Sequence, residues 1–458
     1  MKPARELTPQ ELYRACDPQV FDFTTTENLE DLTEMIGQER AVEAVQFGAD
    51  VDLHGYNLFV LGPSGTGRHT FIKRFLKEKA TEEETPSDWV YVNNFADSRQ
   101  PRVLELPAGE GTRLRDRVAR LIEESHRVIP AAFESDDYRE RRKEIERRAQ
   151  EEQEKAFEEV REHARERGIG IKQAATGFSF VPLVDGKELS PKEYGELPRK
   201  ERERLQQDTE EIAQELQKML QAIPKRVREV FEEIHELDRR VALFAVGNLI
   251  DELRDENRAL PKVVEHLESL RQDIVDNIRL FRGEEESRQP LKMMLGGGQS
   301  GEPESTPLQR YAVNVLISRG NGAGAPVIFA DEPSFHELVG AVEYKARMGT
   351  MVTDFTLLKP GALHRANGGY LVMDARKLLV QPYAWEGLKQ ALKACEVRIR
   401  SLGQVFSLVS TVSLEPEPIP LDVKVVLVGE RLIYYLLKWY DPEFSELFRV
   451  AADFDDRM

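Results

Sequence analysis

Residues 57–70 read NLFVLGPSGTGRHT and decide the fold of the chain around them. Four apolar residues, Leu58–Leu61, run directly into a glycine-spaced loop, and apolar residues at helical spacing follow it. This order is typical of a strand, a phosphate-binding loop and a helix, with Gly62 and Gly67 at the ends of the loop. Glycines let successive backbone N–H groups turn inward and form a nest for phosphate oxygens at a helix N-terminus. The stretch therefore predicts a nucleotide site.

Two positions of the loop depart from the usual G-x-x-x-x-G-K-[ST] pattern. Arg68 stands where a lysine reaches the phosphates, and His69 stands where a hydroxyl binds magnesium, with Thr70 one place late. Arginine is larger and binds as a planar fork, and imidazole is a poor ligand for magnesium. We expect weak binding of ATP or ADP, no requirement for either, and the alternative of a tight turn without ligand. The nucleotide-binding candidates are Gly62, Pro63, Ser64, Gly65, Thr66, Gly67, Arg68, His69, Thr70 and, as argued below, Asp374.

Composition limits the class of protein. A length of 458 residues suggests roughly two to four domains. The net charge of −18 argues against a nucleic-acid partner held by a general positive field. Two cysteines, Cys16 and Cys395, give no disulfide framework, and the longest apolar run, Val241–Val246, is far short of the ~20 residues that cross a bilayer. Because the first residues also lack the apolar core of a signal peptide, we expect a cytoplasmic protein with no membrane partner.

The middle of the chain has the pattern of long helices. Residues 134–166 are dense in Glu and Arg, and apolar residues from Leu205 to Phe244 alternate at spacings of three and four, as in a coiled-coil seam. Pro224 should kink the second helix, and a third helical run covers residues 262–281. The charge runs are most simply the solvated faces of these helices.

Between the first two helical runs, residues 168–198 predict a small β-hairpin. Phe178–Val184 alternates in polarity, and Asp185-Gly186 is a hairpin turn signal. The hairpin would lie at the tip of the helical arm and carry Phe178 and Phe180. These two aromatic residues either contact a substrate or simply pack the tip together.

Strands are expected to resume after a Gly- and Pro-rich linker. The apolar runs that predict them are Tyr311–Ile317, Pro326–Phe329, Gly369–Asp374, Val423–Gly429 and Phe448–Phe454. In a P-loop ATPase, Asp374 would end the strand whose carboxylate helps to hold magnesium. Ala375 stands where a glutamate orients the attacking water, and Glu430 stands where a neutral polar residue is usual. Arg449 either reaches a neighbour's phosphate as an arginine finger or is an ordinary surface arginine.

Other catalytic constellations are incomplete. His336-Glu337 opens like the zinc motif H-E-x-x-H, but Gly340 replaces the second histidine, so we expect no metal site. Neither cysteine has a histidine nearby in sequence, which leaves a spatial pair open. Together, Arg68 and Ala375 remove groups on which phosphoryl transfer depends, and we predict a site that does not hydrolyse ATP.

The segment Ser334–Leu379, SFHELVGAVEYKARMGTMVTDFTLLKPGALHRANGGYLVMDARKLL, closely resembles the Lon-like proteases of the AAA+ superfamily. The resemblance extends over Gly37–Arg99 and Tyr311–Phe454, and the long insertion matches the LonC branch. It implies a ring, usually a hexamer, that feeds unfolded polypeptide to a C-terminal Ser–Lys protease domain, without a need for ATP in that branch. The lid and the catalytic dyad are not expected within these residues, so we assign no catalytic residue.

The predicted fold class is α/β: a P-loop (AAA+) parallel sheet with helices on both faces, interrupted by a coiled-coil insertion tipped by a β-hairpin. The predicted divisions are a lead-in (1–36), a first core half (37–112), the insertion (113–285, tip 168–198), a linker (286–310) and a second core half (311–458).

The predicted function is a homo-oligomeric, ring-forming gate for unfolded protein substrates. In AAA+ rings an aromatic residue of the pore loop contacts the substrate, which makes Tyr344 the main candidate, with helix packing as the alternative. Phe178 and Phe180 are further candidates. Two other functions remain open. One is a working ATPase motor, in which Arg68 and Thr70 replace the missing groups; the other is a coiled-coil scaffold with no protease connection.

Overall fold

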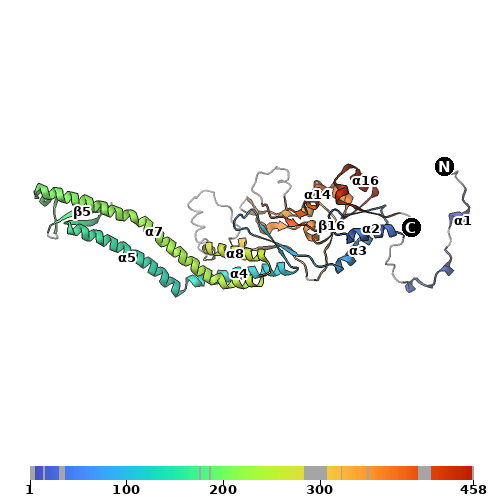
Figure 1. Ribbon diagram of the computed structural model, residues 1–458, viewed down its shortest axis with the longest axis horizontal. Coiled ribbons are helices and arrows are strands. Elements are labelled where there is room, and N and C mark those ends of the chain that lie inside the picture. The colour runs from blue at the N-terminus through green and yellow to red at the C-terminus, as the bar shows by residue number, and fades with distance from the viewer. Residues whose placement is uncertain are drawn as a thin grey trace.

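A computed structural model describes residues 6–13, 16–29, 37–174, 177–184, 187–282, 307–320, 322–347, 350–400 and 414–455. Figure 1 shows an α/β body and a long helical arm that extends away from it. Parts of the predicted lead-in, most of the predicted linker and the Asp185-Gly186 turn lie outside the described residues.

The body is built on a five-stranded parallel sheet with the strand order β17-β1-β16-β13-β8. Its strands are β1 (Leu58–Leu61), β8 (Val327–Ala330), β13 (Gly369–Asp374), β16 (Val423–Gly429) and β17 (Val450–Asp453). Every residue of β1 is buried, as expected for a parallel sheet that is covered on both faces. The predicted α/β class is confirmed, and each of the five strands overlaps an apolar run that the sequence predicts as a strand, including Leu58–Leu61 before the glycine loop.

Helices cover both faces of this sheet because side chains alternate along each strand. Leu58 and Val60 face one layer, and Phe59 and Leu61 face the other. The first layer contains α2 (Glu39–Asp50) and α3 (Arg68–Glu82). The second layer contains α11 (Phe335–Val339), α12 (Ala362–Ala366), α13 (Ala375–Val380), α14 (Ala384–Ala394), α16 (Arg431–Tyr440) and α17 (Phe444–Leu447).

A second, antiparallel sheet joins the body to the arm. It has the order β3-β2-β7 and consists of β2 (Asp88–Val92), β3 (Arg102–Leu106) and β7 (Val313–Ile317). The chain leaves this sheet after β3 and returns to it at β7. One face of β2 packs on the arm helices through Val90 and Val92, and the other packs through Trp89 and Tyr91 on the body. Strand β3 was not among the predicted strands.

The arm consists mainly of helices that pack side by side. They are α4 (Glu110–Phe133), α5 (Asp136–Glu166), α7 (Arg199–Glu256), α8 (Pro261–Asp276) and α9 (Ile278–Phe281). Helix α7 has 58 residues and continues through Pro224. At 1.5 Å per residue it is about 87 Å long, and it runs beside α5 to the tip in Figure 1. Ion pairs Arg148–Glu233 and Arg226–Glu152 join the two helices.

The tip carries a three-stranded sheet rather than a simple hairpin. Its strands are β4 (Ile169–Ala174), β5 (Gly177–Val184) and β6 (Lys187–Glu188), followed by α6 (Pro191–Glu196). Phe178 and Phe180 are half-buried and pack against the cluster of Val160, Ile171 and Leu216. This packing agrees with the structural alternative for the two rings, and their role toward a substrate stays a prediction.

Short elements complete the described chain: α1 (Pro9–Leu12), η1 (Pro18–Val20), η2 (Thr26–Asn28), η3 (Pro307–Tyr311), β9 (Ala341–Val342), β10 (Lys345–Arg347), β11 (Thr350–Val352), η4 (Phe355–Leu357), β12 (Leu358–Lys359), β14 (Glu396–Val397) and β15 (Ile419–Pro420). Within the residues that the structure describes, no helix has the length and apolar character to span a membrane.

A buried carboxylate, Asp88, ties the outgoing and returning chain together. Its Oδ2 accepts hydrogen bonds from the N–H groups of Gly109 (3.1 Å) and Gly111 (2.9 Å), at the start of α4. The same oxygen accepts from the Ser318 hydroxyl at 3.0 Å, and Oδ1 accepts from the Arg319 N–H at 2.8 Å, just after β7. Because the side chain is fully buried, water cannot replace it as the acceptor of these four hydrogen bonds.

Replacing Asp88 by Ala should therefore destabilise the protein strongly. Four donors would lose their acceptor at once, and leaving buried polar groups unpaired costs on the order of 1–3 kcal/mol each. We expect a loss of at least about 3 kcal/mol in the free energy of unfolding, measured by urea denaturation. Asp116→Ala, which removes an exposed carboxylate from α4, is the control and should change stability by less than about 0.5 kcal/mol. Equal effects of the two changes would contradict this role.

Two buried histidines should make the protein sensitive to acid. Burial lowers the pKa of His266 to about 4 and that of His364 to about 3, with Arg102 and Arg365 adding to the respective effects. Because these values lie below the unfolded pKa of about 6.5, the folded state binds fewer protons. The free energy of unfolding should fall as pH decreases from about 6.5 to about 4, by roughly 1.4 kcal/mol per pH unit for each histidine.

His266→Phe tests this contribution, because the ring of His266 already stacks on Phe95 at 5.8 Å and its Nε2 has no hydrogen-bond partner. The substitution should make the pH dependence of stability shallower by roughly 1.4 kcal/mol per unit in that window. His235→Phe, at an exposed position on α7, should leave the profile unchanged. If the pH dependence of stability were unaltered in His266→Phe, titratable groups other than His266 would be responsible for the sensitivity to acid.

Candidate functional site

The predicted phosphate-binding loop lies at the carboxyl edge of the parallel sheet, between β1 and α3. Gly65 and Gly67 adopt φ angles of 90° and 76°, and Gly62 adopts 150°. A Cβ on Gly62 would lie 2.5 Å from the carbonyl oxygen of Phe454, so only glycine fits there. The predicted order of strand, loop and helix is therefore present, and the loop has the backbone shape that glycines permit.

Arg68, the first residue of α3, turns into the protein. The side chain is 7% exposed, and its Nη1 donates a hydrogen bond to the carbonyl oxygen of Gly429, at the end of β16. Burial lowers the pKa of Arg68, while the nearby carboxylates of Asp374 and Glu430 act in the opposite direction. The guanidinium is thus engaged with the end of a neighbouring strand and not with the surface of the loop.

The other side chains of the loop are largely exposed. Ser64, His69 and Thr70 lie at the surface, the last two on the first turn of α3. Thr66 Oγ1 donates to the carbonyl oxygen of Pro63 at 3.0 Å, a bond within the loop itself. The groups that remain available to an anion here are backbone N–H groups and a few neutral side chains.

Asp374 ends β13 and caps the next helix. Its Oδ1 accepts a hydrogen bond from the backbone N–H of Lys377 at 2.9 Å, which places the carboxylate at the N-terminus of α13. The following residue, Ala375, is fully buried. The position that carries a water-orienting glutamate in an active ATPase therefore presents a methyl group to the core.

Arg449 lies at the opposite edge of the sheet from the loop. It precedes β17, whose first residue, Val450, pairs with Leu58 at the start of β1. The exposed guanidinium lies 5.5 Å from the ring centre of Tyr56, and its Nε donates to the Glu446 carbonyl oxygen at 3.2 Å. Within one chain it does not reach the loop, so a role as an arginine finger requires a neighbouring copy.

Tyr344 lies in the connection between β9 and the β10–β11 hairpin and not in a helix. The side chain is 42% exposed, and Met351 on the same hairpin is exposed as well. The hairpin thus presents an aromatic and an apolar side chain to solvent. The role of Tyr344 toward a substrate stays a prediction.

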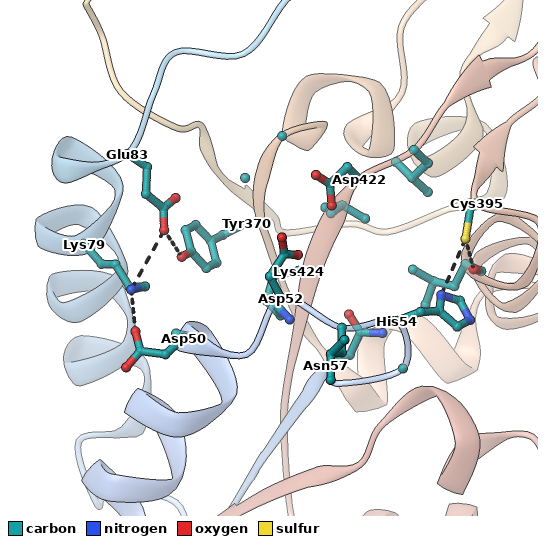
Figure 2. Close-up of a pocket in the computed structure, with 18 residues that line it drawn as sticks. Asp50, Asp52, His54, Asn57, Lys79, Glu83, Tyr370, Cys395, Asp422 and Lys424 are labelled. Atoms are coloured by element: carbon teal, nitrogen blue, oxygen red, sulfur yellow. Dashed lines mark hydrogen bonds and ion pairs between the residues drawn. The ribbon is translucent and has the colours of Figure 1, made fainter.

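A separate cavity of about 410 Å³ lies at the amino edge of the sheet, where β13 and β16 begin (Figure 2). In it, Cys395 Sγ lies 3.5 Å from His54 Nδ1, a spatial pair that connects positions 341 residues apart. Tyr370 donates its hydroxyl to Glu83 at 2.6 Å on the other side of the cavity. No local motif in the sequence marks the Cys–His pair, because each residue belongs to an ordinary loop or helix end.

Among the described residues, no group of three or more His, Cys, Asp or Glu side chains is arranged to hold a metal ion. Lys424 donates to the Val51 carbonyl oxygen at 2.6 Å, and Lys79 pairs with Asp50, so both cations of the cavity already have partners.

Comparison with known families identifies two parts of the chain. Residues 323–455, from before β8 through β17, match the model for the LonB-like AAA domain, and residues 88–121 match the Lon-like LonC helical domain. These two matches, together with the relative described below, support a Lon-like AAA+ protein. The first range includes Tyr344, Asp374 and Arg449, whereas the predicted phosphate-binding loop lies outside both.

Individual relatives match only parts of this Lon-like chain. The Escherichia coli (strain K12) protein "Putative Lon protease homolog" is 35% identical over 101 residues, which are 22% of this chain and 16% of that protein. The aligned region thus spans about one sixth of the relative. The crystal structure of NtrX from Brucella abortus is 16% identical, with a TM-score of 0.20, over 28% of this chain and 26% of that one.

The buried position of Arg68 predicts that this chain releases no phosphate from ATP above background, with or without magnesium. Arg68→Ala should leave that rate at background and lower the free energy of unfolding by about 1–3 kcal/mol, because the Gly429 carbonyl loses a charged donor. Arg74→Ala, on the exposed side of the same helix, is the stability control. Phosphate release that disappears in Arg68→Ala would instead assign the arginine a catalytic role.

Proposed function

We propose that this Lon-like chain is a ring-forming module that admits unfolded polypeptide to a Ser–Lys protease domain without hydrolysing ATP. The observation that supports this most is the position of Arg68. Its guanidinium donates to the Gly429 carbonyl and is almost completely buried, so the group that should neutralise the phosphates is used inside the fold.

The chemistry of phosphoryl transfer makes this position important. Such enzymes act almost wholly by positioning their substrates and stabilising charge, and they do little covalent chemistry of their own. Here the loop offers His69 at the magnesium position, and the buried methyl group of Ala375 replaces a water-orienting glutamate. Because Arg68 is also bound to the Gly429 carbonyl, no side chain of the loop or just after β13 is left to bind the metal and to orient the attacking water in the usual way. The site is therefore a degenerate one, with at most weak binding of ATP or ADP.

A module that does not hydrolyse ATP has to act as a passive entrance. Native domains are commonly ~5–15 kcal/mol more stable than their unfolded chains, and unfolding them requires work. Without that work, only polypeptides that are already unfolded can pass. The entrance would thus select substrates by their folding state and by width.

Exposed aromatic and apolar side chains suit contacts with such substrates. Tyr344 beside the β10–β11 hairpin is the main candidate, and the half-buried rings of Phe178 and Phe180 at the arm tip are secondary ones. The proposed assembly is a homo-oligomeric ring of six copies, by analogy with the rings of Lon-like proteins. Both cysteines are unpaired, which suits a reducing cytoplasm.

The test joins this chain to the Ser–Lys protease domain of a Lon-like protein and compares two substrates, an unfolded casein-like polypeptide and a tightly folded domain. We expect degradation of the unfolded substrate alone, at the same rate with and without ATP. Tyr344→Ala should slow it severalfold, because an aromatic contact is lost. ATP-stimulated degradation of the folded domain would contradict the passive entrance and favour a motor.

Two variants separate a substrate contact from a structural effect of Tyr344. Tyr344→Phe keeps the ring and should retain most of the activity. Phe47→Ala removes an exposed ring from α2, away from the hairpin, and should leave the rate unchanged. Equal losses of degradation rate in Phe47→Ala and Tyr344→Ala would show that removing any exposed ring impairs the protein, which would contradict a specific substrate contact of Tyr344.

A further inference from the structure

A cysteine and a histidine meet at one end of the cavity at the amino edge of the sheet (Figure 2). Cys395 Sγ lies 3.5 Å from His54 Nδ1, and both side chains are exposed to solvent. The predicted phosphate-binding loop lies at the opposite, carboxyl edge, so neither residue takes part in the proposed gate. A thiol within hydrogen-bond reach of an imidazole is a nucleophile with a base beside it.

Backbone contacts hold both members of the pair in position. Cys395 caps the C-terminus of α14, and its carbonyl oxygen accepts a hydrogen bond from the N–H of Leu421 at 2.8 Å, just before β16. His54 lies in the turn after α2, and Lys424 of β16 ties this turn to the sheet by donating to the Val51 carbonyl oxygen at 2.6 Å. Because both segments are anchored to the same strand, the thiol and the imidazole are preorganised to face each other.

The surroundings of Cys395 oppose a thiolate that forms alone. Two exposed carboxylates, Asp52 and Asp422, line the same cavity, and within the described part of the chain no hydrogen bond or ion pair engages either side chain. The sulfur also lies at the negative end of a helix, 3.6 Å from the Leu392 carbonyl oxygen. Transfer of the proton from Sγ to His54 Nδ1 leaves the net charge of the pair unchanged, so the negative surroundings penalise this step little.

The charge of the cavity determines which small molecules it attracts. Four carboxylates and two ammonium groups line it: Asp50, Asp52, Glu83, Asp422, Lys79 and Lys424. Both lysines are engaged, Lys79 with Asp50 and Lys424 with backbone carbonyls. The excess negative charge raises the local concentration of small cations and repels anions. With a volume of about 410 Å³, the cavity is in the size range of small-molecule sites.

We propose that Cys395 is a modification site at which a small cationic disulfide forms a mixed disulfide with the protein. The proton of Sγ passes to His54 Nδ1, and the thiolate attacks one sulfur of the reagent. The new bond joins that sulfur to Sγ, the S–S bond of the reagent breaks, and the leaving thiolate takes the proton from His54. The exchange needs no further oxidant, and a free thiol reverses it. The inference does not rest on the proposed gate.

The second cysteine is a control within the same chain. Cys16 is also exposed, and no hydrogen bond to a histidine involves it among the described residues. With cystamine, a disulfide that carries two ammonium groups, Cys395 should be modified at least about tenfold faster than Cys16, as followed by mass spectrometry of the full chain. The ratio of the rates with cystamine and with the dianionic 3,3′-dithiodipropionate should be severalfold larger at Cys395. Equal rates with cystamine, or equal ratios at the two cysteines, would overturn the proposal.

His54→Ala tests the proton acceptor. The change should lower the rate at Cys395 about tenfold and leave the rate at Cys16 unaltered. Added imidazole should restore part of the lost rate, because it can take the proton from Sγ, whereas a histidine with only a structural role would not be replaced in this way. His235→Ala, at an exposed position on α7, is the matched control and should change neither rate. An unaltered rate at Cys395 in His54→Ala, or a loss that imidazole does not restore, would overturn the proton transfer.

The preference for a cationic reagent is tested by combining Asp52→Asn with Asp422→Asn. Both side chains are exposed, so the double variant should fold normally and unfold at the same urea concentration as the original chain. Its preference for cystamine over 3,3′-dithiodipropionate at Cys395 should fall severalfold, toward the value at Cys16. Asp116→Asn, which removes an exposed carboxylate outside the cavity, should leave the preference unchanged. A preference that survives the double substitution would overturn the selection of cations by this cavity.

Discussion

The arrangement of the whole molecule depends on the buried carboxylate of Asp88. About two hundred residues separate β3 from β7 in the sequence. Bringing the two strands into one sheet closes this long loop, which carries an entropic cost. Asp88 accepts hydrogen bonds from the first turn of the outgoing helix and from the end of the returning strand. Arg319 extends this junction by donating to the carbonyl oxygens of Ser87 (2.6 Å) and Asn367 (2.7 Å). The junction therefore sets where the arm begins relative to the parallel sheet.

The same constraint, a buried charge that needs partners, explains why Arg68 in the loop after β1 points into the protein. Arg68 is satisfied by the Gly429 carbonyl and lies near the carboxylates of Asp374 and Glu430. Drawing it out toward a phosphate would leave that carbonyl without its donor, at the cost of a buried polar group. The end of β16 and the start of α3 thus hold each other in place. Arg68, which departs from the pattern of an active ATPase, thus acts as a structural contact.

Apolar patterning was sufficient to predict every strand of the parallel sheet but only some strands of the smaller sheets, such as β7 and β5. The runs Leu58–Leu61 and Val423–Gly429 are buried on both faces, which gives a continuous signal. Strand β3 was missed because Glu105 and Arg102 interrupt its short apolar pattern, and β4 was missed because Gly170 and Lys172 do the same. The inward turn of Arg68 and the Cys395–His54 pair depend on packing between distant segments, which no local pattern contains.

Helix α16 shows where a sequence pattern needs the fold to be interpreted. The run RLIYYLLKWY suggests a fully buried helix, yet the sheet can cover only one side of it. The remaining apolar side must be covered by something outside the body described here or stay in water, at roughly 25 cal/mol per Å² of apolar surface.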